Sequence, residues 1–160
     1  VFMAADCADE PGDVPAMVKL IREGADVVAG SRYMPGGHQH GKKFFKQFLS
    51  KFAGLTLHYF AGLPTHDATN NFRAYSRRVI ELPIETTASF ALGIELVVKT
   101  HANGWVIKEI PSTWKDRTGG TSRFRLFAWL PEYVKWYLLA YRYAWFGNTK
   151  EKAFSATAQK

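Results

Sequence analysis

Four carboxylates near the start of the chain could hold a divalent cation. Residues 1–15 contain no basic residue and four acidic ones, Asp6, Asp9, Glu10 and Asp13. The apolar residues 1–5 are predicted to end a buried strand, which places these carboxylates at the carboxyl edge of a sheet, where α/β folds bind ligands. Mg²⁺ or Mn²⁺ needs only one or two carboxylates, with water and phosphate oxygens completing the shell. Alternatively, Asp9 and Glu10 only stabilise the N-terminus of the next helix.

Two basic segments have the composition of phosphate sites. In Gly30-Ser31-Arg32-Tyr33 the glycine permits a tight turn, the serine offers a hydroxyl, and the arginine offers a fork matched to phosphate. Arg117 and Arg123 lie six residues apart on a glycine-containing loop, so that they could close on a diphosphate from two sides. The alternative for each segment is an exposed turn or loop.

Two further features are candidates for a site. Residues 66–75 form a polar turn that leads into an aromatic strand, and the alternative is an ordinary capped turn. Glu95 lies within an apolar helix face, and a buried acid must be either paired or functional because an unpaired one is costly.

Composition limits the class of protein. The length of 160 residues suits one domain, and 47% hydrophobic with 22% charged residues excludes a disordered chain. The single cysteine, Cys7, excludes a disulfide framework and a multi-cysteine zinc site. We expect neither a signal peptide nor a clean membrane-spanning helix. Because the sequence opens on Val1 inside an apolar run, we expect an N-terminal part to be missing.

Hydrophobic spacing and glycine or proline positions predict the elements that carry these residues. Helices are expected at residues 11–23, 42–60, 90–103 and 124–146, with a short helical turn at 77–82. Strands are expected at 1–5, 25–29, 71–76 and 105–110, and loops at 35–38 and 115–123. The first 30 residues therefore form a strand–helix–strand unit.

The order of these motifs resembles that of the dolichyl-phosphate mannose synthase-like branch of family 2 glycosyltransferases. Residues 4–15 align without a gap with the family's D-A-D-L-Q-H-P-P-E-D-I-P, and residues 30–33 with its G-S-R-Y/F. Residues 67–75 resemble D-x-T-S-G-F-R-A-Y, and residues 94–95 resemble I-E. Arg117, Gly120, Ser122 and Arg123 fit R-x-x-G-x-S-K/R. The resemblance covers residues 1 to about 123.

Three departures affect the expected site. Ala4 stands where the family has its first metal-binding aspartate, and Ala8 stands where it has glutamine. Asn70-Asn71 replaces Ser-Gly. The resemblance therefore leaves Asp6 as a metal ligand, with Asp9 as a substitute carboxylate.

The resemblance implies an α/β fold, the C-terminal part of a GT-A nucleotide-sugar transferase domain that lacks the N-terminal nucleotide-binding part. Residues 1–123 would be this partial domain, 124–147 an amphipathic membrane-interface helix, and 148–160 a flexible tail. The whole enzyme would transfer mannose or glucose, from GDP-mannose or UDP-glucose, to polyprenyl or dolichyl phosphate with inversion. We expect the fragment alone to be inactive.

The resemblance also implies roles for individual residues. The catalytic arginines would be Arg117 and Arg123, which bind donor or acceptor phosphate, and the Mg²⁺ or Mn²⁺ ligands would be Asp6 and Asp9. The expected substrate-binding residues are Ser31, Arg32, Asp67, Arg73, Glu95 and Ser122.

The last helix favours a membrane surface independently of the family. Its many Trp and Tyr residues are typical of the lipid–water interface, and its charges Glu132, Lys135 and Arg142 favour lying in that interface over spanning it. The alternative is packing on the domain or on a partner chain. The basic, Phe-striped residues 42–51 would add attraction to anionic lipid. We expect peripheral attachment to the cytoplasmic face of a membrane.

Three other hypotheses differ in partner. A family 2 transferase could use a non-lipid acceptor, and a non-catalytic relative could bind nucleotide-sugar or membrane without turnover. The net charge of +7 also suits nucleic acid. We do not expect a nucleic-acid partner, because the aromatic residues form helical stripes and do not lie on a sheet face.

Overall fold

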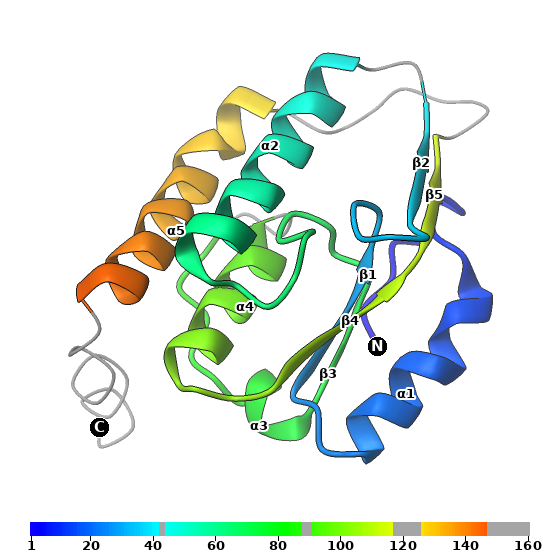
Figure 1. Ribbon diagram of the computed structural model, residues 1–160, viewed down its shortest axis with the longest axis horizontal. Helices are drawn as coiled ribbons and strands as arrows, with labels where there is room; N and C mark the ends of the chain where they lie inside the picture. The colour runs from blue at the N-terminus through cyan, green and yellow to red at the C-terminus, as the bar shows by residue number, and fades with distance from the viewer. Residues whose placement is uncertain (42–43, 88–90, 117–125, 147–160) are drawn as a thin grey trace.

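The computed structural model describes residues 1–41, 44–87, 91–116 and 126–146 (Figure 1). The elements, in chain order, are the 3₁₀ helix η1 (Pro11–Asp13), α1 (Val14–Arg22), β1 (Val27–Ser31), β2 (His38–His40), α2 (Phe44–Ala61), β3 (Arg73–Tyr75), α3 (Arg77–Ile80), α4 (Leu92–Ala102), β4 (Ile107–Pro111), β5 (Thr113–Lys115) and α5 (Leu126–Phe146). This mixed α/β architecture confirms the expected fold class.

Strand β1 is the centre of a three-stranded sheet with the order β3-β1-β4. It runs antiparallel to β3, with Val28 opposite Ala74, and parallel to β4, with Val27 opposite Ile107. All five of its residues are buried. Because both faces of the strand are covered, its first four residues are apolar or glycine, and only the last, Ser31, carries a polar side chain.

Helices cover both faces of this sheet (Figure 1). On one face, Met17 of α1 packs with Phe72 and with Val28 of β1. On the other face, α2, α4 and α5 enclose a larger core that contains Leu57, Val97 and Trp136. The carboxyl end of β1 emerges between these layers, so that residues 31–33 are held from several sides.

Two sequence expectations were wrong. Residues 1–5 are exposed and form one antiparallel bridge, between Phe2 and Arg73, because this segment lies on the outer side of β3 and not beside β1. The loop expected at 35–38 ends in strand β2, which pairs in parallel with β5 from His38–Thr113 to His40–Lys115. Strands of three residues without apolar alternation are recognisable only from their pairing.

Helix α5 packs on the domain through one face. The Tyr137 hydroxyl lies 2.9 Å from the Thr56 hydroxyl of α2, and Trp145 Nε1 donates to the Phe60 carbonyl at 3.2 Å. Trp136 is buried against α4, where the Lys99 ammonium lies 5.1 Å from its ring centroid. The alternative of packing on the domain is thus confirmed for this face. No helix in the described ranges is both long and apolar enough to cross a membrane. The predicted tail at 148–160 lies outside the described residues.

Close packing of α2 on the loop at residues 63–70 depends on Gly54. A Cβ atom at this position would overlap the backbone carbonyl of His66, so either the helix or the loop would have to shift. Helix propensity alone would favour alanine by about 1 kcal/mol. We expect Gly54→Ala to reverse that sign and to lower the free energy of unfolding by about 1–3 kcal/mol, the usual cost of overpacking.

Urea denaturation of Gly54→Ala beside Lys51→Ala, an exposed change on the same helix, measures this effect. A stabilised Gly54→Ala protein would contradict the packing of α2 on this loop.

Candidate functional site

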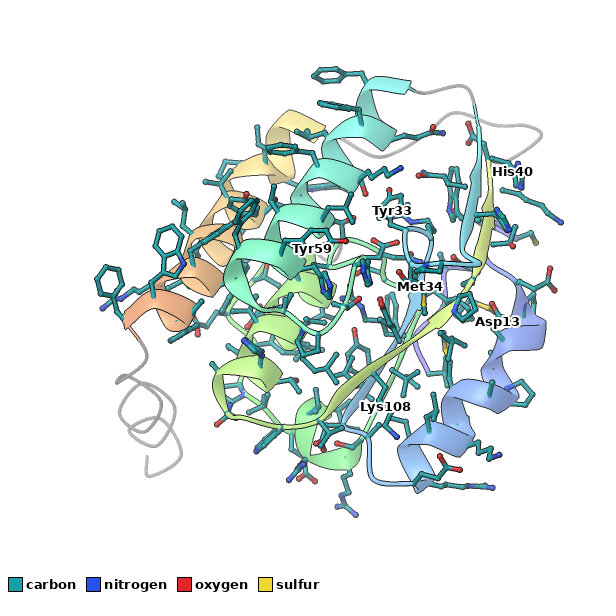
Figure 2. The ribbon with its side chains drawn as sticks, in the orientation of Figure 1. Asp13, Tyr33, Met34, His40, Tyr59 and Lys108 are labelled. Carbon is teal, nitrogen blue, oxygen red and sulfur yellow. The ribbon has the colours of Figure 1, made fainter. Side chains whose placement is uncertain are left out.

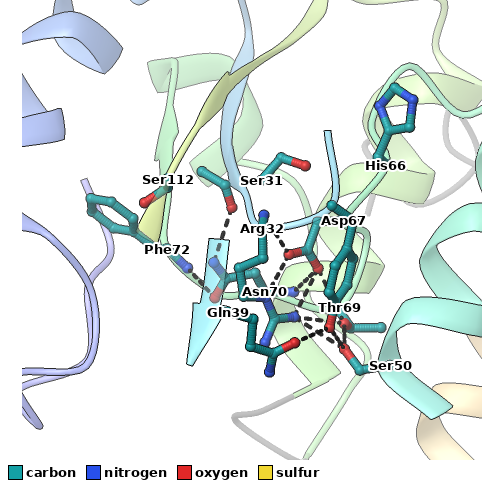
Figure 3. Close-up of polar contacts among 12 residues, drawn as sticks. Ser31, Arg32, Gln39, Ser50, His66, Asp67, Thr69, Asn70, Phe72 and Ser112 are labelled. Carbon is teal, nitrogen blue, oxygen red and sulfur yellow. Dashed lines mark hydrogen bonds and ion pairs between the residues drawn. The ribbon is translucent and has the colours of Figure 1, made fainter. Parts of the chain in front are cut away.

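A buried ion pair lies at the carboxyl end of β1 (Figure 3). Arg32 Nε and Nη2 donate to the two Asp67 oxygens at 2.6 and 2.9 Å, and the Arg32 amide donates to Oδ2 at 3.1 Å. Burial is the largest single influence and would raise the pKa of Asp67, but the charge of Arg32, the hydrogen bonds from its side chain and amide, and the charge of Arg73 together hold that pKa below its usual range. The bidentate geometry fixes both side chains.

Hydroxyl groups extend this ion pair into a network with α2. Arg32 Nη2 also donates to Ser50 Oγ at 3.0 Å and Thr69 Oγ1 at 3.2 Å, and these two oxygens lie 2.5 Å apart. The Tyr33 hydroxyl bridges Ser50 Oγ and Gln39 Oε1, at 2.9 and 3.0 Å. Ser50 was not predicted as a site residue, because it lies outside every recognised motif. Thr69 belongs to the motif at residues 67–75 but was not singled out within it.

Asn70 and Ser31 shape the backbone around the pair. Asn70 Nδ2 donates to the Gly30 carbonyl at 2.9 Å, and the backbone N–H of Asn70 donates to Asp67 Oδ1 at 3.1 Å. Ser31 is fully buried, and its Oγ accepts from the Met34 amide at 3.2 Å. Tyr33 and Met34 follow directly at the end of β1 (Figure 2). The asparagine that replaces the family's serine therefore ties the loop at residues 67–70 to β1.

Arg73 places a second buried cation beside Asp67. The side chain is fully buried on β3, and Nη2 donates to the Asp67 carbonyl at 2.9 Å. Nε and Nη1 have no hydrogen-bond partner among the residues that the structure describes. Gly93 of α4 leaves the space for Nη1, because a Cβ there would lie 2.6 Å from it. Four nearby predicted site residues are thus brought together: Ser31, Arg32, Asp67 and Arg73.

The acidic segment lies close enough to Arg32 for its charges to interact with the guanidinium. Asp6 Oδ1 accepts from the Ala8 amide at 3.2 Å, across a turn in which Cys7 has a φ of 56°. Burial raises the pKa of Asp9 to about 6; Arg32 opposes this shift, and Asp6 adds to it. Asp9 Oδ1 is buried and has no hydrogen-bond partner in the described part of the chain.

These carboxylates fit a hard cation. Within the described ranges, no three His, Cys, Asp or Glu side chains gather in a cluster that could hold a metal. Mg²⁺ nevertheless needs only one or two carboxylates when phosphate and water supply the rest of its shell. The unpartnered Asp9 oxygen, with Asp6 nearby, meets that smaller requirement.

Glu95 is paired within the fold. It is fully buried, and its oxygens accept from the Glu85 and Thr86 amides at 2.7 and 2.8 Å. Lys99, which is also buried, donates to Glu95 Oε1 at 2.6 Å and to the Pro83 carbonyl at 2.5 Å. Together, Glu95 and Lys99 hold residues 83–86 against α4. Of the two alternatives for a buried acid, paired or functional, Glu95 is therefore paired. Arg117, Ser122 and Arg123 lie outside the described residues.

Comparison with known proteins gives one family. The sequence model for glycosyl transferase family 2 matches residues 1–82. The chain is 32% identical over 126 residues to a polyprenol monophosphomannose synthase of Mycolicibacterium smegmatis. The aligned region covers 77% of this chain and 48% of that protein. The chain is also 32% identical over 129 residues to a dolichyl-phosphate hexose transferase of Haloferax volcanii, with 76% and 53% covered. The chain spans about half the length of these relatives.

The raised pKa of Asp9 predicts a pH-dependent effect of Asp9→Asn in the presence of EDTA. The pKa rises from 3.8 to about 6 on folding, so the stability that this group contributes is full below about pH 4 and is lost as the pH rises through 6. At pH 8 the free energy of unfolding of the asparagine variant should therefore exceed that of the wild type by about 1 kcal/mol, allowing for partial exposure of Asp9. At pH 4 the two free energies should be equal.

Thermal unfolding at both pH values, with the exposed Glu10→Gln as control, measures this difference. If Asp9 and Asp6 hold a cation, Mg²⁺ should stabilise the wild type at pH 8 more than Asp9→Asn. An equal gain for Asp9→Asn at both pH values would contradict the burial of this charge.

Proposed function

Because the chain belongs to glycosyltransferase family 2, and so to the GT-A fold, we propose that it forms part of an enzyme that transfers a hexose from a nucleotide-sugar to a polyprenyl phosphate. The family match confirms the resemblance found in the motifs. The observation that carries the proposal is the Arg32–Asp67 network, which gathers a guanidinium and the hydroxyl groups of Tyr33, Ser50 and Thr69 at the carboxyl end of β1, all of them groups suited to contact phosphate. Mannose from GDP-mannose and glucose from UDP-glucose are the proposed donors.

The proposed reaction needs charge stabilisation more than proton transfer. An oxygen of the acceptor phosphate, already an anion near neutral pH, attacks the anomeric carbon. The new carbon–oxygen bond forms as the bond to the nucleoside diphosphate breaks, with inversion. Arg32, with the Ser31 and Ser50 hydroxyls near it, would orient the acceptor phosphate, while Arg117 and Arg123, with Ser122, would bind the phosphates from the following loop. Positive groups that are already in position stabilise the developing negative charge most strongly where the site excludes most of the water.

Asp6 and Asp9 would hold Mg²⁺ or Mn²⁺. When bound, such an ion supplies positive charge to the departing diphosphate. The unpartnered oxygen of Asp9 and its raised pKa support this assignment, because a carboxylate held in a partly buried site gains most from a cation.

The outer faces of α2 and α5 support a membrane as the partner surface. The two helices lie side by side, and side chains project outward from both (Figures 1 and 2). On α2 the residues that are 54–70% exposed are Phe45, Phe48, Phe52, Tyr59 and Phe60. On α5 those that are 59–72% exposed are Leu138, Trp145 and Phe146. Exposed apolar side chains on two helices that pack together are typical of an interaction site.

Charge favours an anionic lipid surface as the occupant of this face. No acidic residue occurs between Asp26 and Asp67, whereas Lys51 on α2 and Arg142 on α5 are exposed. Basic residues beside interfacial aromatic residues attract anionic leaflets such as the cytoplasmic one. A lipid-linked acceptor would be met at the same surface, which is the reason for preferring it to a soluble acceptor.

Transfer of radiolabelled sugar to polyprenyl phosphate by the full-length protein, in detergent with Mn²⁺, tests the proposed activity. We expect a lipid-linked product with one nucleotide-sugar, and a loss of about 100-fold in Arg32→Lys, because lysine keeps the charge but not the fork. Arg22→Lys, an exposed change on α1, is the matched control. No product from a folded protein with any donor, or transfer only to a soluble acceptor, would contradict the proposal.

Vesicle binding tests the proposed membrane face. Phe48 and Phe52 lie one turn apart with stacked rings, 6.2 Å between centroids. The double change Phe48→Ser/Phe52→Ser should lower partitioning onto phosphatidylglycerol-containing vesicles at least tenfold, because two apolar side chains lose their contact with lipid. The matched control is Ile80→Ser/Ile84→Ser, which removes two equally exposed apolar side chains elsewhere. An equal effect of both double variants would contradict this choice of face.

A further inference from the structure

A second polar cluster lies behind the candidate site, around Glu109 of β4. Glu109 Oε2 accepts from the His66 amide at 2.8 Å and from the Thr65 hydroxyl at 3.1 Å, while Oε1 lies 2.5 Å from His66 Nδ1. The Glu109 side chain is 12% exposed and that of His66 is 20% exposed. One carboxylate thus makes three contacts to two consecutive residues of the loop at 63–70.

His58 of α2 holds the other side of this cluster. Its ring stacks on that of His66 with 3.8 Å between centroids, and its Nδ1 lies 2.8 Å from the Leu63 carbonyl. The His66 side chain points away from Arg32 (Figure 3). The imidazole is therefore fixed between a carboxylate and a second ring, and it does not itself enter the Arg32 network.

The contacts of Glu109 continue through the loop to Asp67. The Thr65 hydroxyl, which donates to Glu109, accepts from the Asp67 amide at 3.1 Å. Asp67 in turn makes the bidentate contact to Arg32. A chain of direct hydrogen bonds therefore runs from Glu109 through Thr65 and Asp67 to the guanidinium.

A carboxylate is a costly choice at this position of β4. Glu109 lies two residues after the buried Ile107 and therefore on the same face of β4, the face that α2 and α4 cover. An apolar side chain at this position would avoid the cost of desolvating a charge. What a carboxylate adds is directional acceptors for the His66 amide and the Thr65 hydroxyl. We propose that Glu109 is a positioning residue, which acts through Thr65 to set the orientation of Asp67 and thereby of the Arg32 guanidinium toward a phosphate ligand.

The identity of that phosphate, the polyprenyl phosphate acceptor, rests on the proposed function, whereas the geometric link does not. Two nearly isosteric variants interrupt the chain of hydrogen bonds at different points. Glu109→Met keeps the length of the side chain and removes both acceptor oxygens, and Thr65→Val removes the hydroxyl between Glu109 and Asp67. Glu81→Met, which removes an exposed carboxylate paired with Arg77, is the matched control.

The first measurement is the ¹⁵N NMR signal of Arg32 Nε–H, which Asp67 holds in the wild type. We expect its hydrogen exchange to become about tenfold faster in Glu109→Met and in Thr65→Val, with no further increase in the double variant, because both act on one chain of contacts. Glu81→Met should leave it unchanged. An unchanged Arg32 signal in folded Glu109→Met and Thr65→Val would overturn the proposal, whatever the enzyme's substrate.

The second measurement is kinetic and uses the full-length protein with a short-chain polyprenyl phosphate. Misplacement of Arg32 should raise the KM for this acceptor about tenfold and leave the KM for the nucleotide-sugar unchanged. A merely structural role would lower activity in proportion to folded protein and would move neither KM, and that result would also overturn the proposal. Faster exchange at Arg32 in a protein that has no transferase activity would instead support the positioning role and contradict the proposed function.

Discussion

The buried Arg32–Asp67 pair is the interaction on which the candidate site depends. It joins the end of the central strand to the loop at residues 63–70, and Ser50 and Thr69 extend it to α2 and to the turn. Removing one partner of a buried pair leaves an uncompensated charge, at a cost of about 3–5 kcal/mol. Bidentate geometry and neighbouring hydroxyls are what make this burial tolerable. The pair therefore imposes both the composition and the position of the side chains around it.

A second buried ion pair, Glu95–Lys99, connects segments of the helical layer. It holds residues 83–86 against α4, and Glu85 continues the contact to Lys135 of α5 at 3.1 Å. In the part of the chain that the structure describes, the sheets have three and two strands, and helices and loops that these ion pairs stabilise make up much of the rest. Burial of β1 provides the apolar centre, and the two ion pairs determine how the connecting segments meet it.

The sequence predicts the parts of this arrangement that have a period or a motif. Apolar spacing locates α1, α2 and α4 to within a few residues, and the family resemblance names both Arg32 and Asp67 among the substrate-binding residues. Ser50 and Glu109 could not be predicted, because each lies outside the motifs and contributes hydrogen-bonding groups to partners 18 to 44 residues away. Thr69 lies in a recognised motif, but the motif does not indicate its contact with Arg32. The exposure of residues 1–5 and the pairing of β2 with β5 likewise depend on which segments become neighbours, which local composition does not specify.

Helix α2 connects the two surfaces that the proposed function requires. Ser50 faces inward to Arg32, while Phe48 and Phe52, two residues to either side, are exposed on the outer face. A helix with its side chains is about 10–12 Å across, so the candidate phosphate site and the proposed lipid surface are separated by roughly one helix diameter. An acceptor whose phosphate lies at the headgroup level could reach Arg32 while its chain stays in the membrane.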